Sequence, residues 1–145
     1  MSKRTRTGLI SAVAFALLTA AAGAVQMPSQ SMENDETQSQ IAGVWRGNSV
    51  CAVENSPCHN EVNVYRISEA AGRPGWFSVT GSKIVDGKEI VMGTGDWKYE
   101  QGSHALTTET PAGKFRLVIN RRKMDGSLTL KDGTVFRRIY LQKEN

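Results

Sequence analysis

The sequence predicts an all-β domain over residues 41–145, an eight-stranded antiparallel up-and-down β-barrel. Short stretches rich in Val, Ile, Thr, Phe and Tyr alternate with turn residues, and no stretch keeps an apolar helical period for three turns. Hairpins between sequential strands form a meander. Closing eight such strands into a barrel removes their exposed edges most economically.

Clusters of Gly, Asn, Asp and Pro bound the expected strands. These strands cover residues 42–53, 60–68, 75–85, 88–100, 103–109, 113–120, 123–131 and 134–143. Asp86-Gly87 and Asp132-Gly133 each predict a type I′ hairpin turn, because that turn needs positive φ at both central residues.

Side-chain alternation supports a sheet with one buried face. Phe115, Leu117 and Ile119 share one face of their expected strand. Gly93-Thr94-Gly95 is interpreted as a glycine kink in a long bent strand. It is not a phosphate-binding loop, because neither a G-K-[ST] sequence nor a helix follows it.

Residues 1–24 have the pattern of a cleaved secretory signal peptide. A basic start precedes an apolar run and the small-residue triplet Ala22-Gly23-Ala24. The run is shorter than the roughly 20 residues that span a bilayer. We therefore expect a periplasmic or secreted protein with no membrane span after cleavage. Residues 25–40 are polar and acidic with little to bury, and we expect them to form a flexible leader.

The charge of the mature chain is small. Loss of Lys3, Arg4 and Arg6 with the signal peptide lowers the formal net charge from +4 to +1. This charge gives no reason to expect nucleic acid or an anionic membrane as a partner.

Cys51 and Cys58 are the two cysteines of the chain. In an exported protein an even number of cysteines predicts a disulfide. The alternative is a metal site that includes the adjacent His59, but a C-x-x-C spacing is missing. We expect the disulfide, no metal and no cofactor.

Gly43-Val44-Trp45 opens the first expected strand, and Arg137-Arg138 lies in the last. This pair of signatures resembles the calycin superfamily of lipocalins, fatty-acid-binding proteins and avidins. In that superfamily a G-x-W motif begins the first strand, and an arginine of the last strand packs over the tryptophan. The resemblance implies that the Trp45 indole plugs one barrel end with the Arg137 guanidinium stacked on it.

Arg138 and Tyr140 are similar to the R-x-Y ending of fatty-acid-binding proteins, where both side chains hold the ligand carboxylate. If the apolar face of the strand is interior, however, both residues face solvent unless a bulge intervenes. Aromatic residues that could line a cavity, or alternatively fill the core, are Trp76, Phe77, Trp97 and Tyr99.

We expect no catalysis, because His59 and His104 have no partners that the sequence reveals. The first expectation is a non-catalytic binding module for a small apolar or amphipathic ligand. The alternative is a protein-binding barrel, such as an inhibitor of a secreted or periplasmic hydrolase. The chain resembles metalloprotease-inhibitor barrels in size and topology, and residues 25–40 could insert into a partner's cleft. A third alternative is an envelope component that presents loops. The segment 51–59 also resembles one in short secreted bacterial proteins of unknown function.

Overall fold

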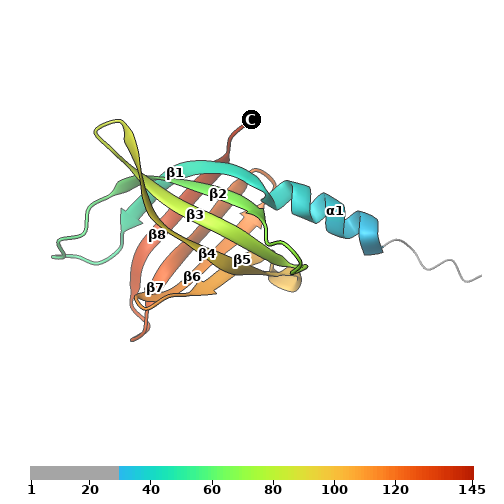
Figure 1. Ribbon diagram of the computed structural model, residues 1–145. Helices are drawn as coiled ribbons and strands as arrows, with labels where there is room; N and C mark the ends of the chain where they lie inside the picture. Colours follow the sequence, from blue (N-terminus) through green and yellow to red (C-terminus); the bar gives the residue numbers. More distant parts are fainter. Residues whose placement is uncertain (1–29) are drawn as a thin grey trace, which may run out of the picture.

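Each strand of the barrel pairs antiparallel with its neighbour in sequence, and β8 pairs with β1 to close it (Figure 1). The computed structural model describes residues 30–145; the predicted signal peptide lies outside them. A helix, α1 (Gln30–Ile41), precedes the barrel, and a 3-10 turn (Gln101–Ser103) joins β4 to β5. The strands are β1 (Gly43–Cys51), β2 (Glu61–Glu69), β3 (Trp76–Val85), β4 (Lys88–Glu100), β5 (Ala105–Glu109), β6 (Gly113–Asn120), β7 (Lys123–Leu130) and β8 (Val135–Lys143). The predicted fold class is confirmed.

The two predicted hairpin turns differ. Asp86 and Gly87 have φ of 50° and 74°, as a type I′ turn requires. The prediction for Asp132-Gly133 is wrong, because only Gly133 has positive φ there (89°). Four residues separate β7 from β8. The loop therefore turns earlier, with the Gly133 N–H donating to the Leu130 carbonyl at 3.0 Å.

Helix α1 occupies most of the segment for which we expected a flexible leader. Its last residue, Ile41, is buried against the barrel end (1% exposed). The Lys143 ammonium donates to the carbonyls of Ser39 and Gln40 at 2.8 and 3.0 Å, which satisfies groups that a helix C-terminus leaves unpaired. Contacts with the barrel therefore stabilise the last turn of this helix. Within residues 30–145, no helix is long and apolar enough to cross a membrane.

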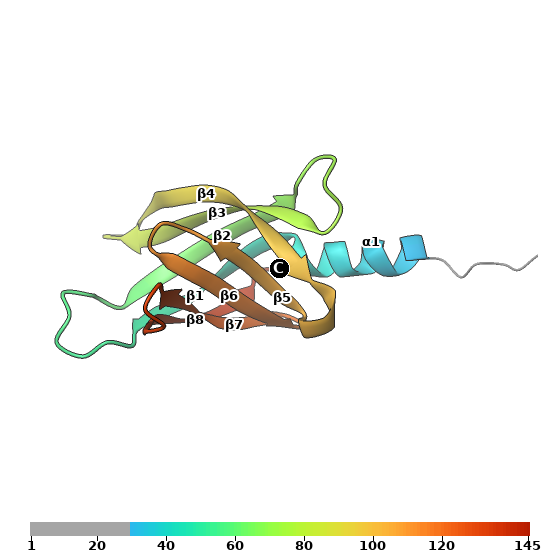
Figure 2. The same cartoon turned by 90° about the horizontal axis from the view of Figure 1, so that it is seen from below.

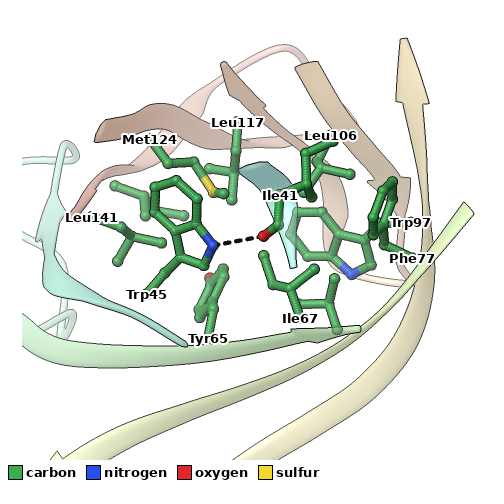
Figure 3. Close-up of a cluster of buried hydrophobic side chains, with 12 residues drawn as sticks. Ile41, Trp45, Tyr65, Ile67, Phe77, Trp97, Leu106, Leu117, Met124 and Leu141 are labelled. Carbon is green, nitrogen blue, oxygen red and sulfur yellow. Dashed lines mark hydrogen bonds between the residues drawn. The ribbon is translucent and has the colours of Figure 1, made fainter. Parts of the chain in front are cut away.

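The apolar core fills the end of the barrel next to α1. Figure 3 shows the Trp45 indole inside this cluster, with its N–H donating to the Ile41 carbonyl at 2.9 Å. The core consists of Ile41, Trp45, Tyr65, Ile67, Phe77, Val79, Trp97, Leu106, Leu117, Met124, Ile139 and Leu141. Toward the other end the inward positions become polar and charged, with Ser49, Glu61 and Arg137 in contact.

The barrel wall is incomplete between β4 and β5. These strands pair at only three positions, the last being Lys98 with Thr107. From there toward the β3–β4 hairpin, β4 pairs with β3 alone. Figure 2 shows β4 diverging from the β5–β6 hairpin. This divergence positions the candidate site.

Candidate ligand-binding cleft in the barrel wall

A cleft of about 470 Å³ opens where β4 leaves β5. The residues that line it are Tyr65, Val79, Gly81, Met92, Gly93, Thr94, Gly95, Asp96, Trp97, Thr108, Glu109, Thr110, Pro111 and Phe115. They come from β2, β3, β4 and the β5–β6 hairpin. Its volume is within the range of small-molecule sites, about 300–1,000 Å³.

Glycines at inward positions keep the cleft empty. Gly93 pairs with Gly81 across the β3–β4 ladder, and Gly95 pairs with Val79. A Cβ atom built on Gly93 or Gly95 meets nothing within 4 Å, and neither residue has a φ in the left-handed region. Backbone geometry therefore does not require glycine here. What the missing side chains provide is open space in front of the aromatic residues. The β3–β4 register shifts between Gly81 and Ser82, which leaves Met92 unpaired just before the predicted glycine kink.

Three aromatic rings line the cleft, and Trp97 contacts both Tyr65 and Phe115. The centroids of Tyr65 and Trp97 are 6.0 Å apart at an interplanar angle of 69°, and those of Trp97 and Phe115 are 5.3 Å apart at 42°. Such edge-on and tilted pairs are favourable and hold the rings in fixed orientations. Burial raises the pKa of Tyr65 to about 12, so its phenol is neutral at physiological pH. The lining of the cleft is mostly apolar.

The charged groups of the cleft are acidic. Asp96 and Glu109 line it, and no lysine, arginine or histidine does. The Arg73 guanidinium holds Asp96 at 2.6 Å. Glu109 makes no ion pair within the described residues. The cleft therefore disfavours an anion and suits a neutral or cationic ligand.

The four aromatic residues predicted to line a cavity do not line the same one. Trp97 and Phe77 both belong to the buried core, at 7% and 1% exposed, and of the two only Trp97 also lines the cleft. Tyr99 lies nearer the α1 end of the barrel, where its hydroxyl is 2.9 Å from Nδ1 of His104. The ring of Trp76 lies outside that core, with the Arg73 guanidinium 4.0 Å from its centroid. The core-filling alternative thus describes Phe77 best.

The pair Arg138 and Tyr140 lies on the exposed outer face of β8. Ile139 and Leu141 take the inner positions, and no register shift separates these residues along β8. A carboxylate clamp inside the barrel is therefore not formed, and the solvent-facing alternative describes both residues. Neither of them lines the cleft.

The predicted stacking of Arg137 on Trp45 is wrong. Strand β8 runs antiparallel to β1, so Trp45 lies opposite Lys143 and Arg137 lies opposite Cys51 at the other end of the pair. The cation at Trp45 is Lys143, whose Nζ is 5.8 Å from the ring centroid. Trp45 itself is fully buried in the core at the end of the barrel, as predicted.

Arg137 has a different set of partners. It donates to the Ser49 hydroxyl and to the His59 carbonyl, both at 3.0 Å, and pairs with Glu61 at 3.3 Å. Its side chain is only 15% exposed, so it cross-links the inner face of the barrel to the β1–β2 loop.

The disulfide between Cys51 and Cys58 is confirmed and closes the β1–β2 loop. A disulfide is compatible with an extracytoplasmic protein. In the described part of the chain, no group of three or more His, Cys, Asp or Glu residues is arranged to hold a metal ion.

Sequence reasoning missed most of the cleft, including Tyr65, Gly81 and Phe115. One signal was present, because Gly93 and Gly95 share the alternation parity of Trp97 and so fall on the inner face of the strand. Comparison with known proteins found no family model and no curated sequence that matches the chain. The class of protein is therefore defined by the structure alone: a closed antiparallel barrel with an aromatic cleft in its wall.

Proposed function

We propose that this protein is an exported, non-catalytic binding module whose wall cleft takes a small apolar or amphipathic ligand. The observation that carries the proposal is the open space beside Tyr65, Trp97 and Phe115, kept free by Gly93 and Gly95. Rigid aromatic rings beside an empty apolar volume are typical of ligand sites. A barrel of this size has room for one small ligand.

The acidic rim of the cleft, formed by Asp96 and Glu109, indicates the charge of the ligand. With Asp96 and Glu109 as the charged lining residues, a neutral or cationic ligand is preferred over an anionic one. A cationic group would also be attracted to the faces of the aromatic rings.

Kinship with calycins is part of the proposal. The closed meander and the G-x-W motif at the helix-covered end support it. The cation beside Trp45 is a lysine rather than an arginine, and the proposed ligand enters through the wall, so the kinship gives the fold but no ligand class.

The test compares two glycine substitutions. Gly95→Leu fills the cleft, whereas Gly102→Leu adds the same side chain in the turn after β4, where a Cβ also meets nothing within 4 Å. Fluorescence titration with N-phenylnaphthylamine, a neutral apolar probe, should give saturable binding to the wild type and to Gly102→Leu. Gly95→Leu should weaken binding by about tenfold or more, because one leucine removes much of the contact surface. Equal affinity of all three proteins would contradict the proposal.

Competition tests the sign of the charge. Dodecyltrimethylammonium should displace the probe at lower concentration than dodecyl sulfate, both below their micelle concentrations. Glu109→Gln should reduce that preference. A stronger effect of the sulfate would contradict the acidic-rim argument.

A further inference from the structure

The edge of β4 facing β5 is unpaired over most of its length. From Lys88 to Trp97, β4 pairs with β3 alone, and the β4–β5 ladder begins at Lys98. The Asp96 carbonyl accepts a hydrogen bond from the Thr108 hydroxyl at 3.3 Å, so it points toward the β5 side. Because main-chain groups alternate in direction along a strand, those of Thr94 point the same way. A row of such groups is a template for another extended chain.

Exposed apolar side chains gather beside this edge. Ile90, Val91 and Met92 are 45%, 62% and 49% exposed. Val85 and Val62 are each 39% exposed; Val85 ends β3 beside β4, whereas Val62 lies on β2, with β3 between it and the edge. These are five of the six exposed large hydrophobic residues in the described part of the chain. Neighbouring side chains alternate between the two faces of a strand, so these residues do not form a single patch, but exposed apolar residues on an unpaired edge favour association with another extended chain.

The edge and the cleft form one continuous surface. Met92, Thr94 and Asp96 belong to the unpaired stretch and also line the cleft. An extended chain laid along β4 would therefore present alternate side chains to the cleft and to solvent. One large apolar side chain would lie against Trp97 and Phe115, in space that Gly93 and Gly95 leave open.

The acidic side of the cleft favours a basic residue next to the apolar anchor of the bound chain. Glu109 lies on the opposite lip of the cleft, and its carboxylate has no ion pair within the described residues. Asp96 is already held by Arg73. Lys114 lies opposite Glu109 in the β5–β6 ladder but forms no ion pair with it, so a basic side chain next to the apolar anchor would find its partner in Glu109.

We propose that the β4 edge binds an extended peptide segment by strand addition, with an apolar anchor in the cleft and a basic residue facing Glu109. Main-chain hydrogen bonds to β4 give affinity, and the cleft gives specificity. This inference rests on the proposed function, because it assigns a peptide as the ligand of the same cleft.

The experiment selects binders from a phage-displayed library of random linear peptides on the purified protein. Enriched sequences are synthesised in two forms, unmodified and N-methylated at alternate residues, and their affinities are measured by calorimetry. N-methylation keeps the side chain but removes the N–H that strand addition needs. We expect enriched peptides with an apolar residue near a basic one. Their affinity should fall about tenfold when the N–H facing β4 is methylated, and much less at the adjacent positions.

Protein variants provide matched controls. Gly95→Leu should abolish peptide binding, whereas Gly102→Leu should leave it unchanged. Glu109→Gln should weaken peptides that carry the basic residue and spare those in which it is replaced by glutamine. Val62→Ser changes an exposed apolar residue on β2, with β3 between it and the edge, and should have less than a twofold effect.

Three outcomes would overturn the inference: no enrichment over an unrelated β-barrel, binding that is indifferent to N-methylation at every position, or sedimentation that reveals a dimer paired through β4. If N-phenylnaphthylamine still binds in a manner sensitive to Gly95→Leu, the small-ligand function survives the loss of the peptide inference. If the probe does not bind in this way, both the small-ligand function and the peptide inference are refuted.

Discussion

Replacement of Trp45 by alanine tests how the α1 end of the barrel is stabilised. The indole is fully buried and its N–H donates to the Ile41 carbonyl at 2.9 Å. Truncation of a buried tryptophan removes its transfer free energy and leaves a cavity, which together cost about 3–5 kcal/mol. Trp45→Phe keeps most of the ring but leaves the Ile41 carbonyl without its donor, at about 1–2 kcal/mol.

The assay is equilibrium unfolding in urea followed by far-ultraviolet circular dichroism, which does not depend on tryptophan emission. Trp76→Ala is the matched control, because this ring is only partly buried, lies outside the core and stacks under Arg73. Its loss should cost about 1 kcal/mol or less. If Trp45→Ala lost less than about 1 kcal/mol, or no more than Trp76→Ala, the reasoning that Trp45 plugs the barrel would be refuted.

Three further predictions concern pH, the disulfide and the buried arginine. The pKa of Tyr65 is raised from 10.0 to about 12, so its neutral form contributes stability that is complete below pH 10 and is lost as the pH rises toward 12. The unfolding free energy should fall by up to about 1.4 kcal/mol per pH unit in that window, and Tyr65→Phe should flatten the fall; identical slopes would contradict this. Replacing Cys51 and Cys58 by serine should lower the unfolding free energy by about 2–3 kcal/mol, and a reductant should lower the urea midpoint of the wild type alone. Arg137→Gln should cost about 2–3 kcal/mol because it breaks a partly buried ion pair and two charged hydrogen bonds, whereas Arg138→Gln should stay within about 0.5 kcal/mol; equal effects in urea melts would contradict this difference.

The strands could be predicted because their signals are local. Period-two alternation around Leu117 and the Asp86-Gly87 turn depend on residues within one hairpin, and the meander follows from short connections. Helix α1 could not be predicted in this way. The carbonyls near its C-terminus are satisfied by Lys143, which is more than 100 residues away in sequence.

The error over Arg137 has a topological cause. The resemblance to calycins named an arginine in the last strand, but register decides which residue of β8 reaches Trp45. An antiparallel pair brings the start of β1 to the end of β8, where Lys143 lies. Counting along that strand from the sequence would have favoured Lys143 over Arg137.

The cleft could not be predicted from the sequence for a related reason. Nothing local indicates that β4 and β5 pair at only three positions, since β4 runs for 13 residues and β5 for five. Sequence alternation does put Gly93 and Gly95 on the inner face. A glycine on the inner face whose φ is not in the left-handed region indicates open space inside the barrel. Which residues face that space is decided only when the barrel closes.

That space also links stability to function. The apolar end of the barrel is filled around Trp45, and Arg137 with Glu61 makes the other end unfavourable for an apolar ligand. The wall beside Gly95, by contrast, leaves an open space with a mostly apolar lining. A side chain there would bury apolar surface and restrict the unfolded chain, so Gly95→Leu should raise the unfolding free energy by about 0.5–1 kcal/mol while removing binding. A gain in stability with loss of binding indicates that the glycine is kept for the ligand. A loss of both would mean that it is needed for the fold.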